Sequence, residues 1–300
     1  MATGNTGVVI LNWNAQADTL RTLSQITDAK FVAIVIDNDS KVDPTKEIIT
    51  KYPATKVIRN DSNRGFAPAS NQGIKWAIEK DCEFVLLLNN DVEISQTSLS
   101  ALVQTLKNNP DCAAVTPAIY YDSNFSRLWY AGNELHLNRA NVPHLKTLVS
   151  VTPYASPTLN GAVLLLRTSA LKQVGLLDED YFAYFEDVDL TLRFARAGYL
   201  LLVEPRVKCV HHVSNSVGEG SPRQYYYFYR NRLKFCKKHG TRLQFIAGQL
   251  SVLGDLCVLA TQATRSMIKL KIHPDRFKIL RAAWRGTNDF YRNYHGEIPT

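Results

Sequence analysis

The sequence has few cysteines, and their spacing excludes a metal cluster. They number five and are scattered along the chain, at Cys82, Cys112, Cys209, Cys236 and Cys257. No pair has the close spacing of zinc ligands, and an odd, scattered set does not indicate a disulfide framework. We therefore expect reduced thiols and a cytoplasmic protein.

Targeting signals and long apolar runs are also lacking. The first residues do not combine a positive segment with an apolar one, so we expect no secretory signal peptide. We also expect no membrane-spanning helix, because the apolar stretches are short or interrupted by polar residues.

Two nucleotide-binding motifs are missing as well. No GxGxxG follows the first predicted strand, which excludes a typical NAD or FAD site, and the absence of GxxxxGK[ST] excludes a P-loop. The net charge of +8 nevertheless favours an anionic partner such as a phosphate, a nucleic acid or an acidic membrane.

One stretch organises the rest of the chain. The apolar run Phe84–Leu88 is followed at once by Asn89, Asn90 and Asp91. Such a run predicts a strand buried on both faces of a parallel sheet, and ligands of these sheets bind at the carboxyl ends of the strands. We interpret Asp91 as a ligand of a divalent metal that carries a diphosphate. The alternative is an aspartate that caps the next helix, and spacing alone does not separate the two.

Strands and helices alternate through the first part of the chain. This pattern predicts an α/β fold with a mostly parallel central sheet and helices on both faces. Several predicted strands end in Asn or Asp, which suggests a polar crevice along one edge of the sheet. The predicted strands are 7–11, 31–36, 56–58 and 84–88, and the predicted helices are 15–26, 44–51 and 69–79.

The middle of the chain is less regular. Residues 111–121, 160–167 and 200–204 are predicted strands. Residues 122–157 have weak periodicity, scattered aromatic residues and prolines, which predicts an irregular insertion with a small hairpin near Trp129–Leu137. Segments of this kind often form part of an acceptor pocket.

The loops after the first three strands are candidates for nucleoside binding. Asp37 or Asp39 could accept hydrogen bonds from a ribose or a pyrimidine N3–H, although both also suit an Asx turn. Asn63 and Gly65 precede a helix whose free N–H groups could receive a polar ligand. An ordinary loop is the alternative there, and taken alone it is favoured.

An acidic cluster opens a helix predicted at 186–197. Acids suit the positive end of a helix dipole, which is the structural explanation for Glu186, Asp187 and Asp189. It does not explain the aromatic residues just before them. A carboxylate packed against aromatic rings is partly desolvated, and its raised pKa makes it a better general base. The aromatic residues are Tyr181, Phe182, Tyr184 and Phe185.

Two adjacent histidines follow the last predicted strand. Neighbours on a strand point to opposite faces, so His211 and His212 cannot both reach the crevice. One neutral imidazole could join Asp91 at a metal. A lone histidine is more often structural.

The C-terminal third is basic. Residues 223–239 mix aromatic and basic side chains, which could bind single-stranded nucleic acid or pack on the core while Arg230 reaches phosphates. Residues 243–270 have an apolar face, and Lys269, Lys271 and further basic residues follow. This composition predicts helices on an anionic membrane surface. A helical pair packed on the catalytic domain or on a second subunit, as in a homodimer, is the alternative.

Several segments together resemble family 2 glycosyltransferases, and more narrowly their rhamnosyltransferase-like branch. In chain order they are VVILNWN, VIDNDS, NRGFAPASNQGI, LLLNNDVE, the segment from Asn160 to Tyr199, and VHHVSNS followed by YYYFYRNRLKF. The family's DxD-type metal motif reads Asn89-Asn90-Asp91 here, so Asp91 alone keeps the carboxylate. Ala67-Pro68-Ala69 stands where small glycine-rich residues are usual.

The resemblance implies a GT-A fold, a Mg²⁺ or Mn²⁺ ion and an inverting transfer from a nucleotide-diphosphate sugar. The donor would be dTDP-rhamnose or a UDP-sugar, and the acceptor a glycan or lipid-linked glycan in cell-surface polysaccharide synthesis. No nucleic acid partner is expected. A non-catalytic sugar-nucleotide or polysaccharide-binding module on the same fold is the alternative.

The resemblance also assigns roles to residues. It makes Asp187 the base, and Asp91 with His211 the metal ligands. Residues 1–240 would form the catalytic domain. The composition of the C-terminal part, rather than the resemblance, predicts that 241–300 form a basic helical extension, peripheral on the inner face of the plasma membrane. Expected donor contacts are Asn12, Asn14, Asp37, Asp39, Asn63, Gly65, Asn90 and Arg230, and expected acceptor contacts are Gly161, Tyr184 and Glu186.

Overall fold

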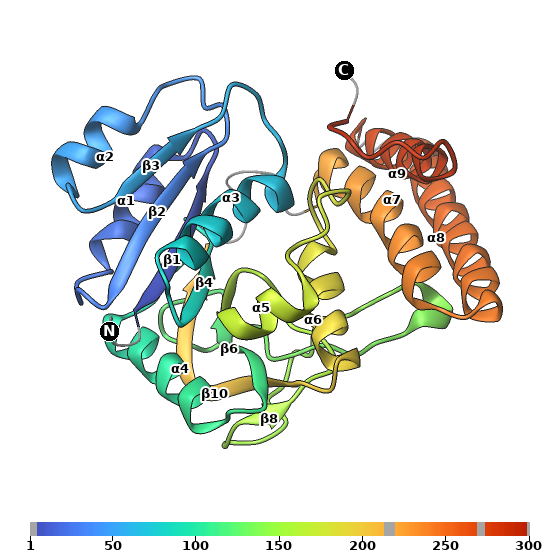
Figure 1. The fold of residues 1–300 in the computed structure, drawn as a ribbon. Helices are drawn as coiled ribbons and strands as arrows, with labels where there is room; N and C mark the ends of the chain where they lie inside the picture. Colours follow the sequence, from blue (N-terminus) through green and yellow to red (C-terminus); the bar gives the residue numbers. More distant parts are fainter. Residues whose placement is uncertain (1–4, 213–219, 269–273, 299–300) are drawn as a thin grey trace. The chain divides into compact units, whose positions relative to one another are not determined.

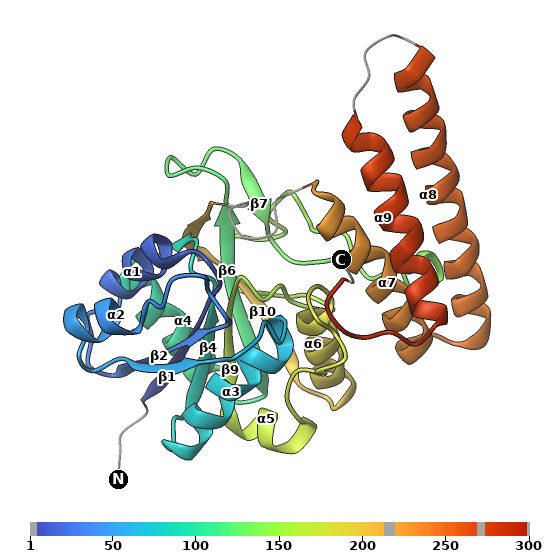
Figure 2. The same cartoon turned by 90° about the horizontal axis from the view of Figure 1, so that it is seen from above.

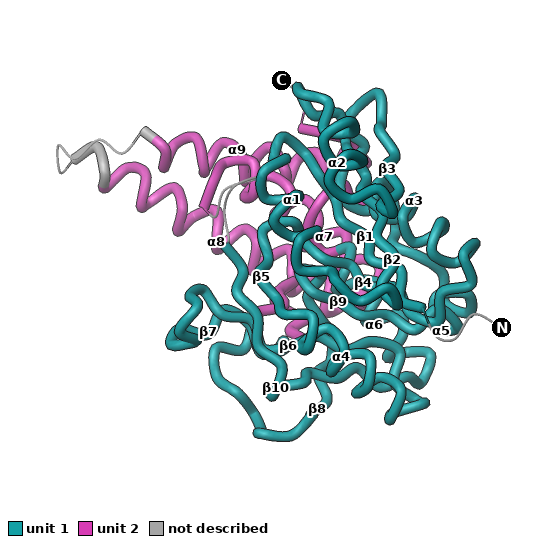
Figure 3. Tube along the Cα trace, turned by 90° about the vertical axis from the view of Figure 1, so that its left-hand side faces the viewer, with its two compact units in different colours: residues 1–134, 144–179, 186–216 teal, residues 135–143, 180–185, 217–300 magenta. Residues whose placement is uncertain are grey.

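The computed structural model describes residues 5–212, 220–268 and 274–298. The chain divides by its contacts into two compact units (Figure 3). Unit 1 comprises residues 1–134, 144–179 and 186–216, and unit 2 comprises residues 135–143, 180–185 and 217–300. These units do not follow the predicted division at residue 240, which concerned function and stays a prediction.

The first half of the unit 1 sheet has the predicted parallel strands. Strands β3, β2, β1 and β4 lie side by side in that order, and each pair is parallel (Figure 1). A βαβ crossover connects parallel neighbours, so the alternation in the sequence predicted these strands well. Their bounds are β1 Thr6–Asn12, β2 Phe31–Asp37, β3 Lys56–Arg59 and β4 Phe84–Leu88.

The second half of the sheet is mixed. Strand β9 (Val163–Arg167) runs antiparallel to both of its neighbours, β4 and β6 (Cys112–Tyr120). Strand β10 (Leu200–His211) is parallel to β6, and the short β5 (Val92–Glu93) is antiparallel to β10. This half departs from the parallel pattern because β9 enters the sheet from the irregular insertion rather than from a crossover helix.

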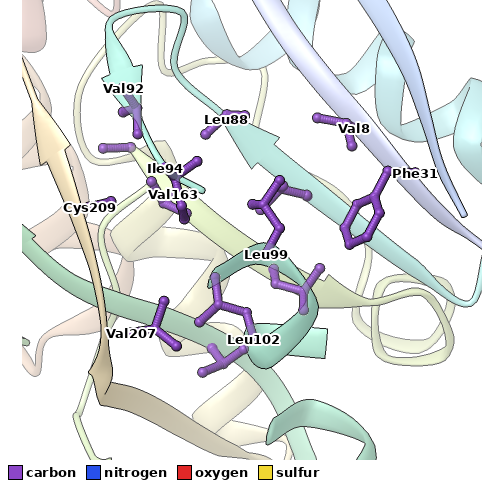
Figure 4. Close-up of a cluster of buried hydrophobic side chains, with 14 of the residues drawn as sticks. Val8, Phe31, Leu88, Val92, Ile94, Leu99, Leu102, Val163, Val207 and Cys209 are labelled. Carbon is purple, nitrogen blue, oxygen red and sulfur yellow. The ribbon is translucent and has the colours of Figure 1, made fainter. Parts of the chain in front are cut away.

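Helices cover both faces of this sheet, as the alternation predicted. Successive residues on β1 point to opposite faces, so Val8 and Ile10 join one apolar cluster and Val9 joins the other. The first cluster includes side chains of α1, α2 and α4, and Figure 4 shows Leu99 and Leu102 of α4 within it. The second cluster includes side chains of α3, α5 and α6. The helices are α1 Gln16–Ser24, α2 Thr45–Lys51, α3 Phe66–Glu79, α4 Gln96–Asn108, α5 Thr168–Val174 and α6 Glu186–Arg196.

The irregular insertion turns back on itself close to the predicted hairpin, with antiparallel bridges that join Asn133 to His144 and His136 to Asn141. Strand β7 (Leu128–Tyr130) turns back onto β6, with Tyr130 opposite Ile119, and β8 (Tyr154–Ala155) pairs with β10. The aromatic run of β7 thus gains a neighbour inside the main sheet, which buries Trp129 and Tyr130.

Unit 2 is helical in its described residues. Its elements are the short 3₁₀ helix η1 (Leu137–Arg139), α7 (Pro222–His239), α8 (Arg242–Ile268) and α9 (Pro274–Tyr291). Helices α8 and α9 form an antiparallel pair (Figure 2), and Val252 and Leu256 of α8 are buried against Tyr229 and Leu233 of α7.

One helix in the described part of the chain, over Arg242–Arg265, is long and apolar enough to cross a membrane by length and composition. A test of length and composition does not show that this helix spans a membrane, so our expectation of no membrane-spanning helix stays a prediction. The core helix of a soluble protein can pass the same test, although here 17% of the most apolar window is buried.

Candidate functional site

The carboxyl ends of the parallel strands and the start of β9 lie at one edge of the sheet. Leu88 is paired with Val163, and the Asn89 N–H donates to the Ala162 carbonyl at 2.9 Å. Residues just after β4 therefore lie beside residues just before β9. This arrangement brings Asp91, on one strand end, to the same edge as Gly161, on the next.

Asp91 is paired with a histidine from β10. The His211 Nε2 lies 3.0 Å from the Asp91 Oδ1, and both side chains are buried. The short strand β5 fixes this pair, because Val92 is opposite His211 in the antiparallel register. His212 points elsewhere: its Nε2 lies 2.8 Å from the Glu93 Oε1. Of the two histidines, His211 is therefore the one that meets Asp91.

The Asp91–His211 pair could hold a divalent cation with help from a substrate. The described residues contain no group of three or more His, Cys, Asp or Glu side chains arranged around a metal position. A carboxylate oxygen and an imidazole nitrogen suit Mg²⁺ or Mn²⁺, and such ions usually take their remaining ligands from phosphates and water. The buried His211 Nδ1 has no hydrogen-bond partner within the described structure, which leaves this ring free of a competing contact there. The residues fit a cation bound together with a diphosphate.

Asp187 is held against the same edge by the backbone. Its Oδ2 accepts the Gly161 N–H at 2.6 Å, and its Oδ1 accepts the Val188 N–H at 2.7 Å. A Cβ on residue 161 would lie 3.1 Å from the Asp187 Cβ, so glycine permits this close approach. Burial raises the pKa of the Asp187 carboxyl, and its backbone hydrogen bonds lower it. The result is a fixed and partly desolvated acid.

Glu186 is buried next to Asp187 but has fewer partners. Its Oε2 has no hydrogen-bond partner among the residues that the structure describes. Burial, followed by the negative charge of Asp187, raises the pKa of Glu186 well above its ordinary value. A protonated Glu186 beside a charged Asp187 is the arrangement that these shifts favour.

The two aspartates after β2 have different environments. Asp37 is fully buried, and it accepts hydrogen bonds from the Asn12 amide at 2.7 Å and the Ser40 hydroxyl at 2.5 Å. The Arg59 guanidinium lies 3.4 Å from its other oxygen. Asp39 is exposed and has a left-handed backbone, with φ of 68°. Asp37 therefore builds the loop, and Asp39 is the one available to a ligand.

The predicted asparagines at this edge belong to a hydrogen-bond network. The Thr19 hydroxyl donates to the Asn12 Oδ1 at 2.8 Å and accepts from the Asn90 amide at 3.0 Å. Asn14 lies at the surface, where its Oδ1 accepts the Lys41 N–H at 2.8 Å. The network fixes the ends of β1 and β4 relative to α1.

Asn63 and Gly65 shape the entry to α3. The Asn63 Oδ1 accepts the Asn38 amide at 2.8 Å and the Gly65 N–H at 3.0 Å. Gly65 has φ of 89°, which other residues rarely adopt. The loop is thus tied to Asn38, next to Asp39, and both lie on the nucleoside side of the predicted site.

Two further predicted residues, Arg230 and Tyr184, lie in unit 2. Arg230 is buried, its Nη1 donates to the Gly296 carbonyl at 2.7 Å, and its Nη2 has no partner in the described structure. Tyr184 has φ of 69°, and its carbonyl accepts the Asn231 amide at 2.9 Å. The aromatic residues predicted beside Asp187 also belong to unit 2, through residues 180–185.

An aromatic cluster near His211 was not predicted as part of the site. The Trp129 ring centroid lies 4.7 Å from that of His211 and 5.0 Å from that of His144, and Tyr130 is also 5.0 Å from His144. Burial lowers the pKa of His144 to about 4, so this imidazole is neutral at pH 7. The adjacent Trp129 and Tyr130 within the irregular insertion were the sequence signal that could have revealed this aromatic cluster.

The fold is that of GT-A glycosyltransferases. One similar solved structure is GalNAc-T7 with UDP, GalNAc and Mn²⁺, with a TM-score of 0.59 and 18% identity. The match covers 75% of this chain and 47% of that one, so the chain spans about half the length of GalNAc-T7.

The sequence itself identifies the family. The model of glycosyl transferase family 2 matches residues 7–175, and the chain belongs to this family. It is 27% identical over 221 residues to an N-acetylglucosaminyl-diphospho-decaprenol L-rhamnosyltransferase of Mycobacterium tuberculosis, covering 66% of this chain and 72% of the relative. It is 22% identical to the dTDP-rhamnosyl transferase RfbF of Shigella flexneri, covering 87% and 90%.

Proposed function

We propose that the protein transfers a sugar, L-rhamnose in the first instance, from a nucleotide-diphosphate donor to a hydroxyl of a glycan or lipid-linked glycan, with inversion at the anomeric carbon. The observation that carries this proposal is that two acids lie at one edge of the sheet. Asp91 follows β4, and the Asp187 carboxylate is held by the Gly161 N–H just before β9, the strand that pairs with β4. Names of the relatives supply the sugar and the donor.

Asp187 is the proposed general base. Its two backbone hydrogen bonds fix both oxygens, and burial raises its pKa, which makes the carboxylate a stronger base than an exposed aspartate. It would take the proton of the acceptor hydroxyl as that oxygen attacks the anomeric carbon. The bond from that carbon to the donor diphosphate breaks on the opposite face, and the nucleoside diphosphate leaves.

Asp91 and His211 are the proposed ligands of a Mg²⁺ or Mn²⁺ ion. When bound, the ion supplies positive charge beside the departing diphosphate. The 3.0 Å between the His211 Nε2 and the Asp91 Oδ1 supports a site with one oxygen and one nitrogen ligand. Arg230, a buried cation with an unused Nη2, is the proposed further contact to the phosphates.

Donor recognition is proposed for the loops after β1, β2 and β3. Asp39 is exposed and can accept a hydrogen bond from the base or the ribose, while Asn63 and Gly65 line the pocket. Asn12, Asn90 and Asp37 would act by holding these loops, because their side chains are already hydrogen-bonded within the protein.

Acceptor recognition is proposed for the surroundings of Gly161 and Glu186, together with Tyr184 and the insertion that carries Trp129. An aromatic ring offers an apolar face for a sugar. The name of the mycobacterial relative indicates a lipid-linked acceptor, which would place the reaction at the cytoplasmic face of a membrane.

A screen of nucleotide sugars tests the function. Melting temperatures are measured with dTDP-rhamnose, UDP-glucose and UDP-N-acetylglucosamine, each with Mn²⁺ or with a chelator, since a ligand of the folded state raises the melting temperature. We expect the largest rise with dTDP-rhamnose and Mn²⁺, and release of dTDP when an acceptor is added. Stabilisation without any transfer or hydrolysis would favour the non-catalytic binding module, and no stabilisation by any of the sugars would contradict the proposal.

The metal is tested in the same assay. Asp91→Ala should abolish the part of the stabilisation that depends on Mn²⁺ and slow transfer, with Glu93→Ala as the control two residues further on. Equal transfer by the parent in chelator and in Mn²⁺ would show that the metal assignment is wrong.

A further inference from the structure

Helix α8 presents an apolar stripe to solvent within unit 2. Its exposed members are spaced by three, four or five residues, so they lie on one side of the helix. Leu243 is 79% exposed and Leu250 is 65% exposed. The stripe consists of Leu243, Ile246, Leu250, Leu253 and Val258.

The opposite side of α8 already has partners. Val252 and Leu256 are buried against α7, and the carboxylate of Asp255 lies 2.6 Å from the Arg232 guanidinium. The stripe therefore remains exposed after unit 2 has formed its own core. A contiguous exposed apolar surface of this length usually marks an interaction site.

The same helix pair is rich in positive charge. The described residues of 242–285 include six Lys or Arg and two Asp. On α9, Arg276, Lys278 and Arg281 are exposed, and the large apolar side chains of Phe277 and Trp284 are exposed among them. Leucine, tryptophan and arginine in this combination are typical of helices at the boundary between headgroups and acyl chains.

We propose that the α8–α9 pair docks on the surface of an anionic lipid bilayer, with the stripe of α8 at the level of the outer acyl chains. The inference goes beyond the proposed reaction and does not depend on it. Charge favours lipid over a second copy of this chain. A second copy would bring its own Lys and Arg side chains close to those of α8 and α9, whereas anionic headgroups neutralise them.

The geometry indicates a helix that lies on the bilayer rather than one that crosses it. Asp255 is near the middle of α8, and its ion pair with the buried Arg232 would have to break before the helix could span. A carboxylate at the centre of a bilayer is costly. The bound protein should therefore be released by alkaline carbonate.

Flotation of the full-length protein with vesicles tests the proposal. We expect binding to phosphatidylglycerol-rich vesicles and little binding to pure phosphatidylcholine. Leu250→Glu should weaken partitioning about tenfold by removing a buried leucine from the interface. The matched control is Val149→Glu, because Val149 is also 65% exposed but belongs to unit 1. The double variant Lys278→Gln/Arg281→Gln should weaken binding about 30-fold, at about 1 kcal/mol for each charge.

Three results would overturn the proposal. The first is equal binding by Leu250→Glu and the parent, and the second is resistance of the bound protein to carbonate. The third is a dimer, seen by light scattering without lipid, that Leu250→Glu dissociates, since a second copy would then cover the stripe. Transfer to a water-soluble acceptor, measured without vesicles, should be equal in the parent and Leu250→Glu. Failure of that reaction in the parent would count against the proposed function and leave the flotation result standing.

Discussion

Two neighbouring carboxyl groups at the start of α6 are both buried, but their hydrogen bonds differ. Asp187 accepts two backbone N–H groups, whereas the Glu186 Oε2 has no partner in the described structure. Hydrogen bonds to the charged form stabilise it, so Asp187 is the better carrier of the negative charge. Glu186 is then the group that keeps a proton.

This difference predicts a pH-dependent gain in stability for Glu186→Gln. The raised pKa means that the folded parent is stabilised by its proton at low pH and loses this contribution as the pH rises from about 4.5 through the folded-state pKa. The amide pays no such cost, so the variant should gain about 1.4 kcal/mol for each unit by which the pKa is raised.

Urea unfolding at a series of pH values measures this gain, with the exposed Glu79→Gln as the control. A constant difference between Glu186→Gln and the parent at every pH would contradict the assignment of the proton.

Asp37 and Asp39 should separate stability from donor binding. Asp37→Asn removes the charge that meets Arg59 and disturbs the hydrogen bonds of Asn12 and Ser40, so we expect a loss of about 1–3 kcal/mol of unfolding free energy. Asp39→Asn should leave stability within about 0.5 kcal/mol, because the side chain is exposed and asparagine tolerates a left-handed backbone.

Calorimetry with the donor nucleotide completes this test. The affinity of Asp39→Asn should fall about tenfold, as for the loss of one charge-assisted hydrogen bond. Unchanged affinity would remove Asp39 from the nucleoside pocket.

Sequence reasoning at the residue scale found chemical types but not partners. It gave Asp37 and Asp39 as alternative nucleoside contacts. The structure distinguishes them, because Asp37 is buried and Asp39 is exposed. Sequence reasoning left His211 and His212 open, and the register of β5 with β10 settles which one meets Asp91. His144 was missed because it lies 15 residues after Trp129 and 14 after Tyr130 in an irregular segment, where no periodicity indicates that they are in contact.

At the scale of elements, close packing of α3 on β1 depends on two glycines. A Cβ at Gly73 would lie 2.3 Å from the Val9 Cγ1, and one at Gly7 would lie 2.4 Å from the Ala77 Cβ. These contacts bring the helix close to the strand whose end carries Asn12. The packing therefore sets the position of the donor-side loops.

Gly73→Ala should destabilise the protein by about 1–3 kcal/mol through overpacking. Gly254→Ala is the matched control, since it is also a helical glycine but has nothing within 4 Å of the added Cβ. Helix propensity predicts that this control stabilises the protein by about 0.5–1 kcal/mol. Thermal or urea unfolding measures both, and equal effects would show that the contact with Val9 does not limit the packing.

The elements of the first half of the sheet could be predicted because each strand is a short apolar run and each helix has its own periodicity. The direction of β9 could not be predicted in the same way. Its run, Val163–Arg167, would look the same in either direction, and the pairing with β4 and β6 depends on the long insertion before it. That antiparallel strand is what brings Gly161 to the Asp91 edge.

At the scale of the whole molecule, the chain combines a GT-A unit that carries the acidic edge with a basic helical unit. The sequence predicted the acidic strand ends of the first unit and the basic character of the second. The family motifs gave the order of the segments in the first unit. The sequence did not predict the limits of the units, because segments 135–143 and 180–185 leave unit 1 and return to it. Part of the closing motif, residues 213–216, and the basic residues Lys269 and Lys271 lie outside the described residues.

Transfer by Asp187→Asn is the most direct test of the central claim. The variant keeps the size of the side chain and removes the base, so the rate of sugar transfer should fall about 10²–10⁴-fold. Donor affinity, measured by calorimetry on the same preparation, should stay within about twofold, since Asp187 faces the acceptor in this account. Transfer near the parent rate would contradict the assignment of Asp187 as the base.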